Sequence, residues 1–332
     1  MVSSLKKGAV TASAPAKVIL FGEHFVVYGE PAIALAIDKR AYAYAQLRKD
    51  KRVYINSADM HVSGTFMGER FQAAKGGSKA RAKLEPVKSA IQQVLEKAQK
   101  KVGVNVQINS DIPVSAGLGS SAAVATSTIV AVSQLLGMEL PRNQIFRMAY
   151  ESERLVHGTP SGIDPAISTY GGSLQFQRGK DFVPLNVQAN IPLVIGNTRV
   201  ERSTGDLVAN VRRIREHYSS IIDPIIKAGG KIAVDAVEAL RQNDLRTVGD
   251  LMNINHALLC AVGVSHEALE RLVYAARKGG ALGAKLTGGG GGGCMVALPE
   301  EKKLKQVMKA IERAGGTAFM ARKTDVGAQV EP

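Results

Sequence analysis

The stretch Pro113-Val-Ser-Ala-Gly-Leu-Gly-Ser-Ser-Ala-Ala123 decides how the rest of this sequence is interpreted. Gly117 and Gly119 leave the backbone free to approach a ligand closely, and a helix is predicted to begin directly after them. The unpaired N–H groups of a helix start favour a phosphate group. The segment lacks the Gly-Lys-Ser/Thr ending of a P-loop, so that fold is excluded. A plain turn before a buried helix stays open as the alternative.

The first half of the chain has the pattern of strands and helices combined. Apolar runs rich in Val, Ile and Tyr, broken by glycine and proline, predict strands within residues 9–45. Helical apolar spacing predicts helices at residues 84–102, 122–136 and 141–157. Further strands are predicted at residues 104–109, 173–177 and 191–196.

The second half is mainly helical in pattern. Residues 206–278 have helical spacing, with breaks predicted at Asp223-Pro224, Gly229-Gly230 and Gly263. A strand, a helix and a strand are predicted beyond them, at residues 294–298, 304–311 and 317–322. A chain of 332 residues suits two domains, and we expect the first to span residues 1–185 and the second residues 186–332. The predicted fold class is α+β.

The net charge of +14 is unevenly distributed. Residues 39–102 contain fifteen Lys or Arg and five Asp or Glu, and therefore hold +10 of it. Aromatic residues make up only 5% of the chain, which leaves few rings on which nucleic-acid bases would stack. Most lysines of the helix predicted at residues 84–102 lie off its apolar stripe. We therefore interpret the charge as a solvated surface that steers anionic substrates, and keep a basic nucleic-acid-binding protein as the remote alternative.

Cysteine, histidine and hydropathy patterns argue against several other classes. Cys260 and Cys294 form no disulfide framework, which suits a reducing cytoplasm, and both are expected to be small buried residues. The six histidines show no zinc-binding spacing. Pro15 and Lys17 interrupt any apolar leader, so export is not expected. The uncharged run at residues 112–138 contains a proline and several polar residues, and is interpreted as a loop and a buried helix rather than a membrane span.

Two carboxylates and one lysine are candidates for chemistry. Glu153 falls inside the helix at residues 141–157, and Asp164 lies in the turn Thr159-Pro-Ser-Gly-Ile-Asp-Pro165. One or two such groups are enough to hold a Mg²⁺ ion that bridges nucleotide phosphates. Asp164 is also explained as a plain helix cap. Lys17 is expected just before a strand at residues 18–21, where a solvated flanking lysine is the alternative.

The six consecutive glycines from Gly288 to Gly293 satisfy a dinucleotide-binding pattern only trivially, since a strand and not a helix follows them. Ordering six glycines costs considerable chain entropy, and a turn requires only one or two of them. Close approach to a ligand or to another loop is the better explanation.

Three segments in register resemble the GHMP kinase superfamily over essentially the whole chain. They are Ala14-Pro-Ala-Lys-Val-Ile-Leu-Phe-Gly-Glu-His24, the loop at Pro113–Ala123, and Lys285-Leu-Thr-Gly-Gly-Gly-Gly-Gly-Gly-Cys294. The resemblance implies a two-domain fold, with an N-terminal α/β domain like one found in a ribosomal protein and a C-terminal ferredoxin-like α+β domain. Gly289, where many relatives carry Ala, is a small departure.

Within this superfamily the first segment is similar to the members that phosphorylate mevalonate; the galactose-specific members would show Asn-Leu-Ile-Gly-Glu-His-Thr-Asp instead. The resemblance implies ATP-dependent phosphorylation of the C5 hydroxyl of (R)-mevalonate in isoprenoid biosynthesis, with Mg²⁺ accompanying ATP. It further implies a cytoplasmic homodimer that binds neither nucleic acid nor membrane. Phosphomevalonate as the substrate, or the C3 hydroxyl as the acceptor, stay open as alternatives.

The resemblance also implies a role for each matching residue. Asp164 corresponds to the catalytic base, and Lys17 to the lysine beside it. Ser121 and Glu153 correspond to Mg²⁺ ligands, and the mevalonate pocket corresponds to Glu23, His24 and Thr204. The loop that binds ATP would comprise Pro113, Val114, Ser115, Ala116, Gly117, Leu118, Gly119, Ser120, Ser121, Ala122 and Ala123. The supporting glycine loop would comprise Gly288, Gly289 and Gly290.

Overall fold

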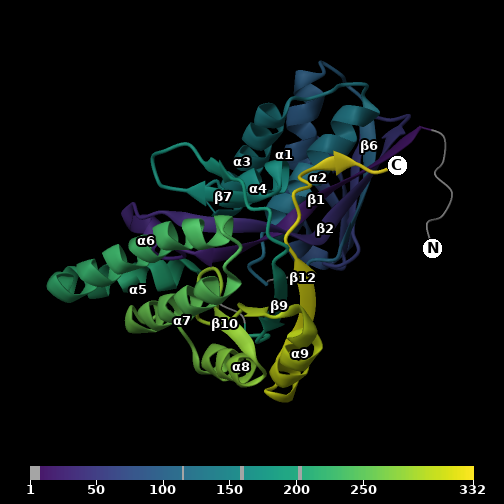
Figure 1. The fold of residues 1–332 in the computed structure, drawn as a ribbon. Coiled ribbons are helices and arrows are strands. Elements are labelled where there is room, and N and C mark those ends of the chain that lie inside the picture. The colour runs from purple at the N-terminus through teal and green to yellow at the C-terminus, as the bar shows by residue number, and fades with distance from the viewer. Residues whose placement is uncertain (1–7, 114–115, 158–160, 201–203) are drawn as a thin grey trace.

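The computed structural model describes residues 8–113, 116–157, 161–200 and 204–332, which form two β-sheets with helices packed on each (Figure 1). The nine-stranded sheet has the order β13-β1-β2-β6-β3-β4-β5, with β7 paired to β2 and β8 to β7. β3 and β6 are parallel, and the other pairs are antiparallel. Its strands are β1 (Ala9–Phe21), β2 (Ala32–Arg48), β3 (Val53–Ser57), β4 (Val62–Met67), β5 (Arg70–Lys75), β6 (Gly103–Ser110), β7 (Ser173–Phe176), β8 (Val183–Leu185) and β13 (Gln329–Val330).

Four helices pack on this sheet, and Figure 1 shows them gathered on one side of it. They are α1 (Ala80–Lys97), α2 (Ser120–Leu135), α3 (Arg142–His157) and α4 (Ile163–Tyr170). α2 lies against β1 and β2, and every residue from 122 to 133 is buried. An apolar helix with no polar face can only be stable in such a position. The helix predicted to follow the two glycines therefore lies at the centre of the hydrophobic core beside the nine-stranded sheet.

The second sheet has four antiparallel strands in the order β10-β11-β9-β12, namely β10 (Ala281–Leu286), β11 (Cys294–Pro299), β9 (Pro192–Asn197) and β12 (Thr317–Arg322). Its helices are α5 (Thr204–His217), α6 (Ser219–Arg241), α7 (Leu245–Ala261), α8 (Glu267–Lys278) and α9 (Leu304–Arg313). Three short 3₁₀ turns complete the regular structure, at η1 (Phe25–Tyr28), η2 (Gly77–Lys79) and η3 (Glu301–Lys303). In the described part of the chain, no helix combines the length and apolar character that a membrane span requires.

The predicted helix breaks at Asp223-Pro224 and Gly229-Gly230 are wrong, because α6 continues through both. A Cβ atom at Gly229 would lie 2.1 Å from the ring of Phe25, and one at Gly230 would lie 1.9 Å from a carboxylate oxygen of Glu30. The two glycines therefore let α6 approach the η1 segment closely. The break predicted at Gly263 is confirmed, since α7 ends at Ala261 and α8 begins at Glu267.

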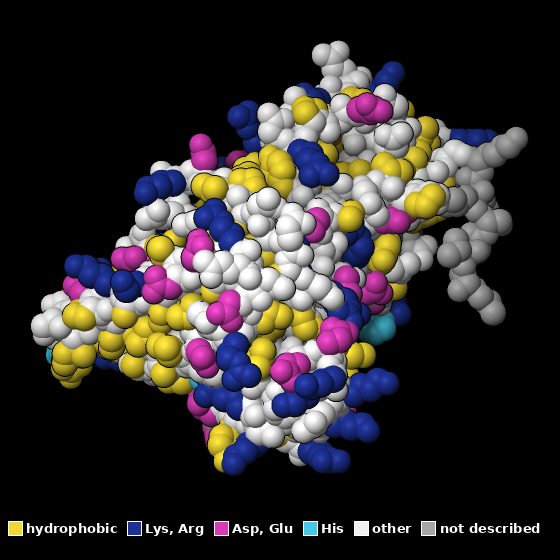
Figure 2. All heavy atoms as spheres, in the orientation of Figure 1, with side chains coloured by type: hydrophobic (Ala, Val, Ile, Leu, Met, Phe, Trp, Pro, Cys, Tyr) yellow, Lys and Arg dark blue, Asp and Glu magenta, His cyan; other side chains and the backbone are white. Residues whose placement is uncertain are grey.

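The basic stretch at residues 39–102 is more β-rich than predicted. β3, β4 and β5 occupy its centre, and α1 ends at Lys97 instead of continuing to residue 102. Lys88, expected on a solvated face, is buried and forms ion pairs with Glu69 and Glu85 at 3.1 and 3.0 Å. Figure 2 shows Lys and Arg side chains spread among Asp and Glu over the visible face, and they form no continuous basic patch there.

The last strand, β13, follows the second sheet in the sequence but belongs to the first sheet. β13 pairs with β1 at Ala12↔Val330 and Ser13↔Gln329, and the N–H of Glu331 donates to the carbonyl of Thr11 at 2.8 Å. In Figure 1 the yellow C-terminal segment lies over the purple first strands. No local sequence pattern predicts this pairing.

Candidate active site

Lys17 and Asp164 meet at the junction of β1 and α4. Lys17 Nζ lies 3.1 Å from Asp164 Oδ1. Lys17 is 5% exposed and stands inside β1, so the expectation of a lysine flanking a strand is wrong. The residue that caps α4 is Gly162, and Asp164 lies in the first helical turn, which excludes the plain cap. The Asp164 side chain is 24% exposed, so its carboxylate can reach a bound molecule.

The glycine loop packs on this ion pair. Gly117 and Gly119 have left-handed backbone angles (φ +73° and +74°), which glycine adopts without strain. The N–H of Lys17 donates to the carbonyl of Leu118 at 2.9 Å, so β1 holds the loop in place. α2 begins at Ser120, and its unpaired N–H groups therefore start beside the Lys17–Asp164 pair. Val114 and Ser115 lie outside the described residues.

Glu153, on α3, fits a ligand for a hard cation. It is 6% exposed, and its Oε2 atom is buried without a hydrogen-bond partner in the described part of the chain. Burial and the negative charge of Asp164 raise the pKa of Glu153 to about 8, and the positive charge of Lys17 opposes the shift. A bound cation would satisfy the free oxygen and favour the ionised form. Ser121, an exposed residue of the first turn of α2, offers a hydroxyl.

Glu23 and His24 occupy the turn between β1 and η1, and both are buried. Glu23 forms an ion pair with Lys285, while Asn255 donates to its second oxygen at 3.3 Å. His24 Nε2–H donates to the carbonyl of Gly289 at 2.8 Å. The structure thus brings the motif at residues 14–24 into contact with the motif at residues 285–294.

The glycine run adopts a conformation that only glycine allows at several positions. Gly288 and Gly290 both have positive φ, and a Cβ atom at Gly290 would lie 2.0 Å from the carbonyl of Val264. The run therefore passes very close to the loop between α7 and α8, which agrees with the predicted close approach to another loop. Direct support of the ATP loop by Gly288, Gly289 and Gly290 stays a prediction. Thr204 begins α5, and its side chain lies outside the described residues.

Sequence reasoning assigned no role to Lys285, Thr287 or Asn255. Thr287 Oγ1 donates to the carbonyl of Ile19 at 2.9 Å and accepts from the Ile19 N–H at 3.1 Å, at an irregularity in the pairing of β1 with β2. Lys285 stands between apolar residues of a strand, a position where a charge is rare unless it is paired. The sequence shows this unusual lysine, but it does not show the partner, because Glu23 is 262 residues away from Lys285.

Comparisons with known proteins agree with this arrangement. Models of the N-terminal and C-terminal domains of GHMP kinases match residues 85–172 and 236–317. The chain belongs to the GHMP kinase family. The predicted resemblance, the two-domain α+β fold and the assignment as an ATP-dependent small-molecule kinase are confirmed.

Individual relatives indicate which kind of GHMP kinase this chain is most similar to. A mevalonate kinase of Thermococcus sibiricus is 46% identical to this chain, and one of Pyrococcus furiosus is 47% identical; each alignment covers 97% of this chain and 98% of the relative. The crystal structure of L. major mevalonate kinase in complex with R-mevalonate has a TM-score of 0.84 at 28% identity, over 98% of both chains. Methanococcus jannaschii mevalonate kinase has a TM-score of 0.81, also at 28% identity, over 98% of this chain and all of that one.

Proposed function

We propose that this chain transfers the γ-phosphoryl group of ATP to the C5 hydroxyl of (R)-mevalonate, forming 5-phosphomevalonate and ADP. The Lys17–Asp164 ion pair beside the glycine loop is the observation that carries the proposal, because a carboxylate and an ammonium group next to such a loop suit phosphoryl transfer. The similarity to mevalonate kinases over nearly the whole chain supports the choice of substrate.

Asp164 acts as the general base in this proposal. Its carboxylate accepts the proton of the C5 hydroxyl as that oxygen forms a bond to the γ-phosphorus, and the bond from that phosphorus to the β–γ bridging oxygen breaks. Lys17 holds the Asp164 carboxylate in position through their 3.1 Å ion pair. The same ammonium group stabilises negative charge on the phosphoryl group as it moves.

The glycine loop positions ATP. Residues 116–123 would surround its phosphates, and the first N–H groups of α2 would donate to the phosphate oxygens. Because phosphoryl transfer depends mainly on positioning and charge stabilisation, this loop and the adjacent ion pair supply most of what the reaction requires.

Glu153 and Ser121 would hold Mg²⁺. The free Oε2 atom of Glu153 and the hydroxyl of Ser121 are oxygen donors of the kind that Mg²⁺ prefers. When bound, the ion neutralises charge on the ATP phosphates. Glu23, His24 and Thr204 are proposed to line the mevalonate pocket, although both carboxylate oxygens of Glu23 are engaged within the protein.

The decisive experiment is an ADP-release assay with mevalonate, phosphomevalonate, galactose and homoserine as acceptors, followed by phosphorus NMR of the product. We expect turnover with mevalonate and a phosphate on C5. Turnover with phosphomevalonate alone, or a phosphate on C3, would replace the proposal with one of the two alternatives from the same superfamily. Absence of ADP release with all four acceptors would refute it.

The cellular and quaternary context is proposed on the same resemblance. The enzyme is proposed to act in the cytoplasm as a homodimer. The boundary between the two domains of each chain is proposed to lie between residues 185 and 186. Sedimentation equilibrium tests the dimer, because a single species at the mass of one chain, 35.2 kDa, would contradict it.

A further inference from the structure

The end of β10 is held by other elements at three consecutive residues, Lys285, Leu286 and Thr287. Each uses a different group: the side-chain ammonium, the backbone N–H and the side-chain hydroxyl. Thr287 bonds Ile19 of β1 in both directions. The glycine run begins at the next residue, Gly288. Its starting point is therefore fixed relative to the first sheet.

Lys285 forms the most enclosed of these contacts. Its side chain is 0% exposed and that of its partner Glu23 is 1% exposed, so neither charge is solvated. Lys285 Nζ also donates to the carbonyl of Leu286 at 2.7 Å, and Asn255 Nδ2 donates to Glu23 Oε2. Two charges buried in this way depend on each other, because either one alone would be left without compensation.

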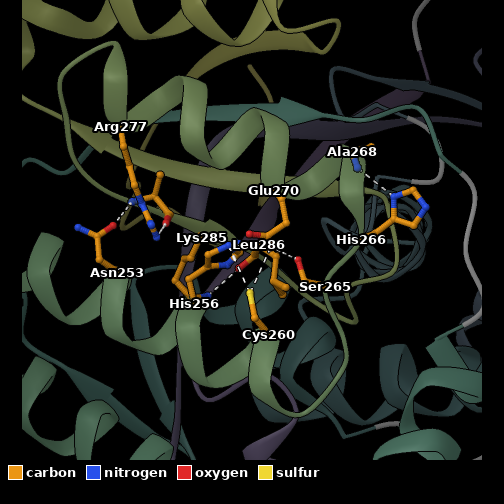
Figure 3. A network of polar contacts seen from close by, with 11 residues as sticks. Asn253, His256, Cys260, Ser265, His266, Ala268, Glu270, Arg277, Lys285 and Leu286 are labelled. Atoms are coloured by element: carbon orange, nitrogen blue, oxygen red, sulfur yellow. Dashed lines mark hydrogen bonds and ion pairs between the residues drawn. The ribbon is translucent and has the colours of Figure 1, made fainter.

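A second group of side chains supports the neighbouring residue. Figure 3 shows His256 lying between Leu286 and Glu270. The N–H of Leu286 donates to His256 Nδ1 at 3.3 Å, so the neutral ring carries its proton on Nε2, which lies 3.1 Å from Glu270 Oε1. Cys260 and Ser265 also donate to Glu270.

His256, Cys260 and Glu270 have the spacing of metal ligands, with their donor atoms within 4.8 Å of one another. A cation would require the lone pair of His256 Nε2 and would move the ring proton to Nδ1, where it would face the Leu286 N–H. The hydrogen bonds instead favour a neutral ring that holds the end of β10. Cys260, expected to be a plain buried residue, belongs to this group and is only half-buried.

We propose that Lys285 is a positioning residue for phosphoryl transfer: its ion pair fixes Glu23, and through Glu23 it fixes His24 beside the glycine run. This inference rests on the proposed function of the site. His24 already donates to Gly289, so the Glu23-His24 pair is attached to the third segment at two points. Lys285 is fully enclosed and its side-chain partner is Glu23, so it acts through Glu23.

The test is a double-mutant cycle of Lys285→Met and Glu23→Gln, with the double variant and with Lys309→Met, an exposed lysine of α9, as the matched control. Thermal midpoints and steady-state kinetics are measured for each. We expect each single variant to raise KM for mevalonate about tenfold with less than about a twofold change in KM for ATP, and the double variant to raise it no further. Lys309→Met should match the wild type.

Two results would overturn the role of Lys285. One is a folded Lys285→Met variant with the wild-type KM for mevalonate. The other is a double variant whose KM is wild-type or rises by the product of the single effects. The double variant keeps the test decisive if Lys285→Met alone does not fold, because it leaves no unpaired charge. If the wild type uses another alcohol, the proposed function fails, and the same cycle run with that alcohol still decides the role of Lys285.

Discussion

A Cβ atom at Gly119 would lie 2.9 Å from Lys17 Cγ and 3.4 Å from Asp164 Oδ2. Gly119 can lie this close to the ion pair because it has no side chain. The glycine loop and the proposed base are thus parts of one packed unit. A carbon atom added at Gly119 would displace the Lys17 side chain and would touch the Asp164 carboxylate at ordinary van der Waals distance.

The first prediction therefore concerns Gly119→Ala. We expect kcat to fall by roughly tenfold to a hundredfold, because the Lys17 side chain must shift from its position beside Asp164. Gly137→Ala is the matched control: Gly137 has φ +73°, against +74° at Gly119, but no atom within 4 Å of an added Cβ. Both variants should lose about 1 kcal/mol of stability from backbone strain, and only Gly119→Ala should lose activity. Equal activities would show that the contact is unimportant.

The second prediction is that Asp164→Asn lowers kcat by about a hundredfold or more, because the amide cannot accept the hydroxyl proton. ATP binding, measured by calorimetry, should stay close to that of the wild type. Asp235→Asn, at an exposed position of α6, controls for the loss of one negative charge. Near-normal turnover of Asp164→Asn would remove Asp164 from its assigned role.

The third prediction links Glu153 to pH and Mg²⁺. The pKa of Glu153 is raised from its ordinary value of 4.5 to about 8, so between these pH values the folded protein retains a proton that the unfolded chain has lost. Without Mg²⁺, stability should therefore decrease as pH rises through this range. Mg²⁺ requires the carboxylate and should restore part of the loss.

Thermal midpoints from pH 5 to pH 9, with and without MgCl₂, test this expectation for Glu153→Gln. The variant should show a weaker pH dependence and a higher Mg²⁺ requirement for turnover. Glu151→Gln, at an exposed position on the same helix, is the control. Unchanged Mg²⁺ titrations in Glu153→Gln would exclude it as a ligand.

The fourth prediction concerns acid stability. Burial lowers the pKa of His256 from 6.5 to about 4. Between these values the unfolded chain binds a proton that the folded protein does not, so stability falls as pH decreases through this range. His256→Gln should lose part of that dependence, and His217→Gln, exposed on α5, should retain it. Identical pH profiles for the wild type and His256→Gln would contradict the buried neutral ring.

Local sequence patterns predicted most strands and helices but misjudged positions where tertiary contacts decide. The sequence predicts that Lys17 flanks a short strand, because a charged residue normally marks the edge of a strand. In the structure β1 runs from Ala9 to Phe21, and Asp164 compensates the buried ammonium. Gly229 and Gly230 likewise resemble a helix break, yet they serve close packing against Phe25 and Glu30.

The residues of the candidate site also divide into those that local sequence identifies and those that only tertiary contacts reveal. The glycine loop and Glu153 were identifiable from residue type and resemblance, because their chemistry is expressed within one short segment. The Lys285–Glu23 ion pair joins distant segments, so its partner emerges only from the folded chain. Lys285 is a charge within an apolar strand, and only the folded chain shows that it is buried and paired.

The return of β13 to β1 has a consequence for synthesis of the chain. Domains generally begin to fold on the ribosome in the order in which they emerge. Here β1 emerges first, but its outer neighbour emerges after the second sheet is complete. Until residue 330 has left the exit tunnel, the nascent protein carries an open strand edge at β1, where another polypeptide can pair. Emergence of β13 is therefore the step that covers this part of the β1 edge.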